Sequence, residues 1–334
     1  MQFYILNILI AVFILFFTGN ITAEKEPAGT VYTITHTISI IGSSSGYSGP
    51  LGELESVVIP LKRVGRLFLI EAKIDNTVGN FLFDTGAAQL VLNSTYFRKY
   101  MTTSGGEGSG ITGSTGTILH TQITKLDVAG LMYSNISADV TDLGHIENRR
   151  GVKVLGLFGV SMLKGLEMVI DLSHNELRLY RLDKSGNRMP SQNTEFRADI
   201  TEKVELYHNI LFVKARIGGK VLDFCLDTGA ESNVLNSFSP KKVLSTVTIL
   251  RRSDLMGAGS GEAEVLLGKL NDFVLGDRSI PDMQTIIASL DALSATYGYP
   301  IDGMLGFDFF EKGQVCINLV KNEMKISFNK SGKS

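Results

Sequence analysis

The chain has no tryptophan, and it is poor in cysteine, proline and histidine, with 2, 7 and 5 residues of each among 334. Two cysteines are too few for a disulfide framework. The histidines stand singly, without the spacing of metal ligands, so the sequence predicts neither a metal nor another cofactor. Lysine and arginine number 32 against 34 acidic residues and form no basic stripe, which argues against nucleic-acid binding.

The remaining composition is that of an ordinary globular protein. Hydrophobic residues make up 44% of the chain and charged residues 20%, which argues against disorder. A chain of this length exceeds the usual size of a single domain. We therefore expect two domains, each large enough to bury its own core, with about 130 to 150 residues apiece.

Only the N-terminus carries a long apolar run. Residues 3–17 are apolar except for Asn7, which is about the length of the hydrophobic region of an export signal and short for a membrane span. Ala23 precedes a polar segment and is the expected cleavage point. We therefore predict that residues 1–23 form a signal peptide and that the protein is exported, to the periplasm or the medium. No lysine or arginine precedes the apolar run, so an uncleaved N-terminal membrane anchor is the alternative.

A long-period internal repeat organises the rest of the chain. The matched segments keep their order and nearly their spacing: residues 69–74, 81–87, 155–159 and 171–179 recur as 212–217, 224–230, 302–306 and 318–326. We therefore expect two homologous units, 55–183 and 200–330. An N-terminal extension, 24–54, precedes them, and a polar linker with glycine and proline breakers, 184–199, joins them.

The repeat also bears on the two cysteines. Cys225 and Cys316 stand where the first unit has the apolar residues Leu82 and Val169. We therefore expect two buried thiols that pack as small apolar side chains rather than a bridge.

Both units have the pattern of β-proteins. Short apolar or alternating runs recur between clusters of glycine, asparagine, aspartate and serine, which predicts an all-β fold. Only short helices are expected, over residues 160–165, 289–297 and 307–312. Residues 30–41 alternate in the manner of a strand, for which the sequence indicates no partner.

Each unit contains one Asp-Thr-Gly-Ala motif, at Asp84 and at Asp227. A single Asp-Thr-Gly is a weak signal, because about one chain in ten of this length would hold one by chance. Two copies in register, each directly after a hydrophobic run, are far more specific. A strand that ends in a tight glycine-containing turn presents its carboxylate at a defined point. Two such carboxylates can divide the tasks of general base and general acid.

Over residues 55–330 the sequence resembles the retropepsin-like aspartic peptidases. The resemblance implies two homologous all-β lobes with the active site at their interface. It implies that Asp84 and Asp227 share a proton and activate a water molecule, with no metal. It also implies that threonine hydroxyls link the two turns and that glycines let backbone N–H groups approach the carboxylates. The supporting residues would be Thr85, Gly86, Thr228 and Gly229.

Glycine-rich segments follow the two aspartates at nearly equal spacing, at 111–116 and 255–261. They resemble the flaps of this family, hairpins that close over an extended peptide and hydrogen-bond its main chain. The implied flap residues are Ile111, Thr112, Gly113, Met256, Gly257 and Ala258. Two later elements, 157–159 and 304–306, resemble the segment that packs behind each catalytic turn in the family.

The motifs differ from the pepsin pattern. Ala87 and Ala230 stand where pepsin-like enzymes carry serine or threonine, and neither glycine-rich segment contains tyrosine. Loss of a hydroxyl donor should raise the pKa of the dyad and move the working pH toward neutral. We predict an aspartic endopeptidase that cleaves extended polypeptides as a monomer. The alternative is an exported peptide-binding pseudo-peptidase without turnover.

Overall fold

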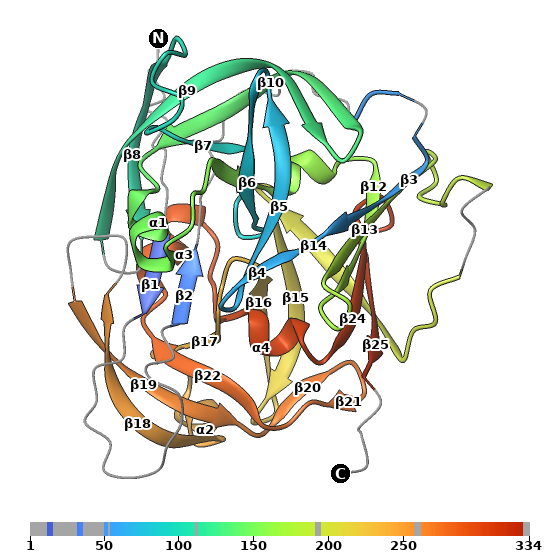
Figure 1. The fold of residues 1–334 in the computed structure, drawn as a ribbon. Helices are drawn as coiled ribbons and strands as arrows, with labels where there is room; N and C mark the ends of the chain where they lie inside the picture. Colours follow the sequence, from blue (N-terminus) through green and yellow to red (C-terminus); the bar gives the residue numbers. More distant parts are fainter. Residues whose placement is uncertain are drawn as a thin grey trace, which may run out of the picture.

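The computed structural model describes residues 12–15, 32–35, 50–52, 54–110, 113–190, 195–256 and 262–329. Strands dominate it and the helices are short (Figure 1), so the predicted all-β class is confirmed. Within these ranges no helix has the length and apolar character needed to span a membrane.

The first unit consists of a large sheet and the strands that lead out of it. Its strands are β3 (Ser56–Pro60), β4 (Lys62–Val64), β5 (Leu67–Ile74), β6 (Thr77–Phe83), β7 (Val91–Asn93), β8 (Thr103–Gly110), β9 (Gly113–Val128), β10 (Leu131–Thr141), β11 (Gly156–Phe158), β12 (Leu166–Asp171) and β13 (Glu176–Arg181). Its helices are α1 (Gly144–Arg150) and the 3-10 helix η1 (Val160–Leu163). Ahead of the unit, β1 (Val12–Leu15) pairs antiparallel with β2 (Tyr32–Thr35).

The second unit repeats this order. Its strands are β14 (Ile200–Tyr207), β15 (Ile210–Ile217), β16 (Lys220–Leu226), β17 (Asn233–Asn236), β18 (Val247–Met256), β19 (Glu262–Leu270), β20 (Phe273–Leu275), β21 (Arg278–Ser279), β22 (Met283–Ala288), β23 (Gly303–Leu305), β24 (Gly313–Asn318) and β25 (Glu323–Phe328). Its helices are α2 (Lys241–Leu244), α3 (Asp291–Tyr297) and α4 (Phe307–Phe310).

The spatial order of the strands shows that the two units are homologous. In the first unit the order is β5-β6-β11-β7-β10-β9-β8, and in the second it is β15-β16-β23-β17-β22-β19-β18. In both, the strand that precedes the Asp-Thr-Gly motif pairs in parallel with a short strand from much later in the unit. Each aspartate therefore lies at a point where distant parts of its own unit meet.

A shared sheet joins the two units. Its order is β3-β13-β12-β24-β25-β14, and the central pair, β12 and β24, is antiparallel and comes from different units (Figure 1). Val169 lies opposite Cys316, which is its own counterpart in the repeat. The pseudo-twofold axis that relates the units therefore passes through this strand pair.

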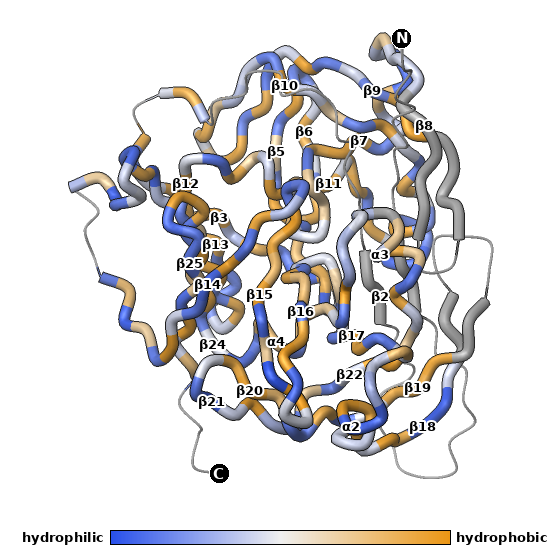
Figure 2. The backbone as a smooth tube through the Cα atoms, turned by 180° about the vertical axis from the view of Figure 1, so that it is seen from behind, coloured by the Kyte–Doolittle hydropathy of each residue, from blue (hydrophilic) through white to orange (hydrophobic). Residues whose placement is uncertain are grey.

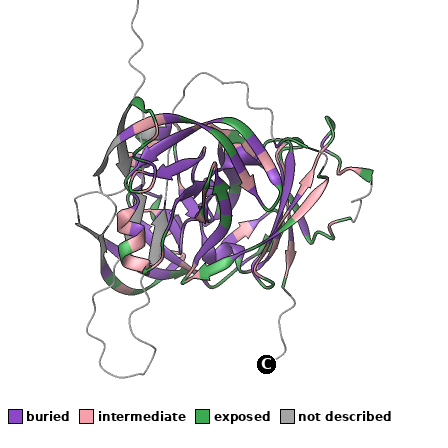
Figure 3. Ribbon diagram, turned by 45° about the horizontal axis from the view of Figure 1, so that its top comes forward, coloured by how far each residue is buried: buried purple, intermediate pink, exposed green. Residues whose placement is uncertain are grey.

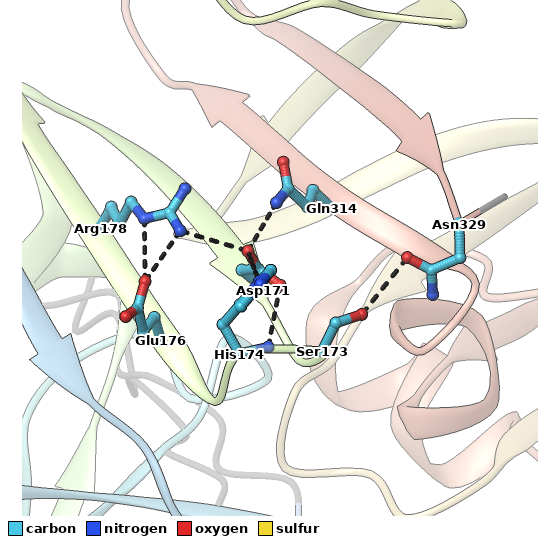
Figure 4. A network of polar contacts seen from close by, with 7 residues as sticks. All are labelled: Asp171, Ser173, His174, Glu176, Arg178, Gln314 and Asn329. Carbon is cyan, nitrogen blue, oxygen red and sulfur yellow. Dashed lines mark hydrogen bonds and ion pairs between the residues drawn. The ribbon is translucent and has the colours of Figure 1, made fainter.

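Polar side chains flank that axis in complementary pairs. The buried carboxylate of Asp171 accepts a hydrogen bond from Gln314 Nε2 at 2.5 Å (Figure 4), and Glu167 Oε2 accepts one from Asn318 Nδ2 at 2.9 Å. Gln314 is the repeat counterpart of Glu167, and Asn318 is that of Asp171. Each contact thus joins one acid to one amide. In a pair of two first units, Glu167 of one copy would instead lie beside Asp171 of the other, and the two carboxylates would repel each other. The differences between the repeats therefore favour pairing of the first unit with the second.

We expect Asp171→Ala to lower the free energy of unfolding by about 2–4 kcal/mol, because it leaves the amide of Gln314 and the guanidinium of Arg178 without their buried acceptor. Urea denaturation would measure the loss. His174→Ala is the matched control, because that side chain contacts the same carboxylate but is 65% exposed. It should change stability by less than about 1 kcal/mol, and an equal effect of both substitutions would contradict this account.

The interior is apolar, as the alternation of the strands predicts. Hydrophobic residues follow the central strands, such as β15 and β16 (Figure 2), and the strands at the centre of the molecule are buried (Figure 3). Cys225 and Cys316 are both buried and unpaired, as expected from their repeat counterparts. Burial raises the pKa of the Cys225 thiol well above its ordinary value, so it remains a neutral packing group.

The short helices predicted over 160–165, 289–297 and 307–312 occur as η1, α3 and α4, each trimmed at an end. Two further helices, α1 and α2, were not predicted from the sequence. Among the residues of α1 only Ile146 is buried, so the segment lacks an apolar periodicity. The repeat nevertheless held a signal, since α1 is the counterpart of the predicted α3. The strand expected within 30–41 is β2, whose partner β1 lies in the predicted signal segment.

Candidate active site

Both Asp-Thr-Gly turns are supported from behind by a short strand. Asp84 follows β6 and Asp227 follows β16. The backbone N–H of Asp84 donates to Phe158 O at 3.2 Å, and that of Asp227 donates to Leu305 O at 2.9 Å. These carbonyls belong to β11 and β23, the strands that pair in parallel with β6 and β16. The position of each aspartate is therefore set by strand pairing.

The glycines that end the two supporting segments allow this close packing. A Cβ atom on Gly159 would lie 2.5 Å from the carbonyl oxygen of Ala87, and one on Gly306 would lie 2.6 Å from that of Ala230. A side chain of any size would push the segment away from the turn. The elements at 157–159 and 304–306 thus pack directly behind the turns.

The turns are tied to each other by reciprocal hydrogen bonds. Thr85 N donates to Thr228 Oγ1 and Thr228 N donates to Thr85 Oγ1, both at 3.0 Å. The hydroxyls donate onward across the interface, Thr85 Oγ1 to Leu226 O at 2.9 Å and Thr228 Oγ1 to Phe83 O at 2.8 Å. All four bonds are buried and join one unit to the other, so the relative position of the two aspartates is closely constrained.

The two carboxyl groups lie against one another at this interface. Asp84 Oδ1 accepts hydrogen bonds from the N–H of Gly86 at 2.9 Å and of Ala87 at 3.2 Å, and Asp227 Oδ1 accepts one from Gly229 N at 2.8 Å. The Asp227 carboxyl also packs closely against Gly86. A Cβ atom added to Gly86 would lie 2.6 Å from Asp227 Oδ1. The structure therefore brings together the six residues of both motifs.

Burial governs the charge of this pair. Both carboxyls are fully buried, and burial raises the pKa of Asp84 to about 7. Burial also raises the pKa of Asp227 well above its ordinary value, and the neighbouring charge of Asp84 raises it further. Two adjacent buried carboxyls cannot both ionise readily, so the pair keeps a proton at neutral pH. Among the residues described, no group of three or more histidines, cysteines or acids is placed to hold a metal.

In each unit one asparagine connects the strand that follows the Asp-Thr-Gly turn, β7 or β17, to the start of a helix, a role that the sequence analysis did not assign. Asn93 Nδ2 donates to Val154 O at 3.0 Å, and Asn236 Nδ2 donates to Ile301 O at 3.3 Å. Their Oδ1 atoms accept the N–H groups at the starts of α1 and α3, both at 3.4 Å. The repeat could have indicated that these asparagines are important, because both occupy the last matched position after the aspartates.

The surroundings of the two turns differ in charge. Glu231, four residues after Asp227, is buried and forms an ion pair with Arg150 of the first unit. Arg66, also of the first unit, pairs with Asp308 at 2.8 Å and donates to the backbone oxygen of Glu231 at 3.0 Å. The counterpart of Glu231 beside the first turn is Ala88. Sequence reasoning missed this network because its members are distant in the chain and come from different units.

The glycine-rich segments predicted as flaps belong to two hairpins, β8–β9 and β18–β19. Gly113 begins β9, opposite Gly110, and Met256 ends β18, opposite Glu262. The other four predicted flap residues lie outside the described residues: Ile111, Thr112, Gly257 and Ala258. The described residues of both segments therefore lie at the ends of these paired strands.

Two homologous β units that meet through interlocked Asp-Thr-Gly turns define the two-lobed fold of the aspartic proteinases. A solved structure supports this assignment of the fold. The aspartic proteinase from Irpex lacteus matches with a TM-score of 0.50 and 13% identity over 84% of this chain and 100% of that one. Basic 7S globulin from soybean matches with a TM-score of 0.47 and 9% identity over 83% and 96% of the two chains.

The sequence comparison points to the same class. Residues 213–309 match the family model described as aspartyl protease, a stretch that includes the second Asp-Thr-Gly motif. No curated protein sequence matches the chain. The family match over residues 213–309 and the shared fold both support the predicted resemblance to the retropepsin-like aspartic peptidases.

Proposed function

We propose that this protein is an aspartic endopeptidase in which Asp84 and Asp227 form the catalytic dyad. The observation that carries the proposal is the burial of two adjacent carboxyls on turns tied together by reciprocal threonine hydrogen bonds. General acid–base catalysis of amide hydrolysis requires one group that accepts a proton and one that donates a proton. A pair that holds one proton at neutral pH supplies both.

In the proposed reaction, the ionised carboxylate removes a proton from a water molecule while the protonated carboxyl donates its proton to the substrate carbonyl oxygen. The water oxygen adds to the carbonyl carbon and forms a tetrahedral diol. The carboxyl that took the proton from water then passes it to the amide nitrogen, and a diol hydroxyl returns its proton to the other carboxylate. The C–N bond breaks, which releases an acid and an amine. The dyad ends with one proton, as it began. Because water attacks the carbonyl carbon directly, no covalent enzyme intermediate forms.

The substrate that we infer is a polypeptide in extended conformation. The hairpins β8–β9 and β18–β19 can supply main-chain hydrogen bonds to an extended chain, a mode of binding that requires the substrate backbone to be unfolded. Because both aspartates belong to one chain, we propose that the protein works as a monomer. We further propose that it is exported, since the apolar run at 3–17 has the length of an export signal.

Cleavage of denatured protein by the chain that begins at residue 24 tests the proposal, with Asp84→Asn and Asp227→Asn as controls. Products would be identified by mass spectrometry from pH 3 to 8, because the raised pKa of the dyad predicts activity that extends toward neutral pH. We expect internal cleavage by the parent protein alone. Equal inactivity of all three proteins, with retained peptide binding, would instead support the pseudo-peptidase.

A further inference from the structure

The helices α1 and α3 occupy corresponding places in the two units. Each has seven residues, begins after a leucine with φ −108° and ψ 12°, and ends at a left-handed glycine with φ 61°. The correspondence is therefore ungapped, and the last residue of α1, Arg150, is the counterpart of Tyr297 in α3. Arg150 pairs with Glu231, whereas the position related to Glu231 in the first unit is Ala88.

Tyr297 is buried among residues of both catalytic turns. It is 4% exposed and belongs to the same apolar cluster as Ala88, Cys225 and Ala230. Cys225 and Ala230 lie two residues before and three residues after Asp227. Both carboxyls of the dyad are fully buried as well, so the burial of Tyr297 is compatible with a place in the same site. Its helix, α3, also packs beside β8, the first strand of one hairpin.

The hydroxyl of Tyr297 has no hydrogen-bond partner among the described residues. Burial raises its pKa well above the ordinary value, and the nearby Cys225, Asp227 and Asp84 raise it further. The hydroxyl therefore stays protonated and neutral over the pH range in which proteins are folded. A buried hydroxyl without a partner is unfavourable. Phenylalanine would fill the same space without that penalty.

We propose that the Tyr297 hydroxyl donates a hydrogen bond to a main-chain carbonyl of the bound peptide, on the Ala88 side of the dyad. On the opposite side, the related position is already filled by the ion pair of Arg150 and Glu231. The two sides of the dyad therefore differ: one carries a hydroxyl without a partner among the described residues, and the other carries an ion pair. This asymmetry would select one direction of the peptide chain, which two identical units could not do. The inference rests on the proposed peptidase function.

The test is Tyr297→Phe, measured as kcat and KM on one unstructured peptide, chosen from a peptide library screened for binding to the parent protein and for cleavage by it. We expect kcat/KM to fall by about 10- to 100-fold, the effect of losing one hydrogen bond to substrate. The urea midpoint should stay the same or rise, because the variant removes an unpartnered hydroxyl. Tyr133→Phe is the matched control: its buried hydroxyl donates to Met162 O at 3.1 Å. That variant should lose stability and keep kcat/KM.

A value of kcat/KM within twofold of the parent value would overturn the inference, as would equal losses in Tyr297→Phe and Tyr133→Phe. Calorimetric titration with the same peptide, its scissile amide reduced to an amine, separates this inference from the proposed function. If the parent binds this peptide without cleaving the original, and Tyr297→Phe weakens binding at least tenfold, the peptidase proposal fails and the tyrosine contact stands. If the parent neither binds nor cleaves, both fail.

Discussion

Asp227→Asn is expected to lower kcat/KM by about a thousandfold or more while making the folded protein more stable at neutral pH. The amide can neither accept the proton of water nor share a proton with Asp84, so the acid–base step is lost. In the folded protein, Asp227 occupies a site where burial and a neighbouring carboxyl oppose its ionisation. Asparagine has nearly the same shape and removes that opposition.

The stability effect has a definite pH dependence. The pKa of Asp84 rises from 3.8 to about 7 on folding, so between these values the folded protein holds more protons than the unfolded chain. Stability from this group is therefore full at low pH and is lost as the pH rises toward 7. The loss amounts to at most about 4 kcal/mol. Burial and the charge of Asp84 raise the pKa of Asp227 as well, so its carboxyl carries a stability penalty of the same sign. We expect Asp227→Asn to remove about 1–3 kcal/mol of that penalty at pH 7 and little at pH 4.

Urea denaturation of the parent and Asp227→Asn at pH 4 and pH 7, beside hydrolysis of one peptide, would measure both effects. Groups elsewhere in the chain titrate equally in both proteins, so their effect cancels in the difference between the two free energies of unfolding. An active Asp227→Asn variant would remove Asp227 from the dyad. A variant that is inactive because it is less stable at both pH values would assign the carboxyl a structural role instead.

Gly86→Ala is expected to reduce activity below one hundredth of the parent value and to lower the free energy of unfolding by about 2–4 kcal/mol. The new Cβ would lie 2.6 Å from Asp227 Oδ1 and 2.7 Å from its Cγ. The short Asp227 side chain cannot move aside without losing the hydrogen bond from Gly229 N. The turn itself is tied across the interface by Thr85. Either the carboxyl or the turn must therefore leave its place.

Gly144→Ala is the matched control for this substitution. Gly144 begins α1, and its new Cβ would meet only the carboxylate of Asp142 at 3.0 Å. That side chain is exposed, so it can move aside and water can replace the hydrogen bond that it accepts from Gly144 N. Alanine also favours the helix more than glycine does, so stability should be unchanged or slightly higher. Peptidase assays and urea denaturation of both variants would distinguish a specific effect at Gly86 from a general intolerance of alanine.

Several features were available from the sequence alone. The repeat indicated two units, and alternating apolar runs indicated strands, because both signals are written locally along the chain. The paired motifs also named Asp84 and Asp227 as candidates, since a strand that ends in an Asp-Thr-Gly turn constrains its own carboxylate. Helix α1 escaped prediction because it buries only Ile146 and therefore has no amphipathic face.

What the sequence determined by itself was therefore the all-β class, the duplication and the residue types at the candidate site. The tertiary structure decided how the units meet: the pairing of β12 with β24, the reciprocal threonine bonds, the ion pair of Arg150 with Glu231, and the burial of the Tyr297 hydroxyl without a partner among the described residues. The threonine bonds join residues 143 positions apart, and the Arg150–Glu231 ion pair joins residues 81 positions apart. Their energies depend on distance and burial in the folded chain, and neither quantity is encoded in local pattern.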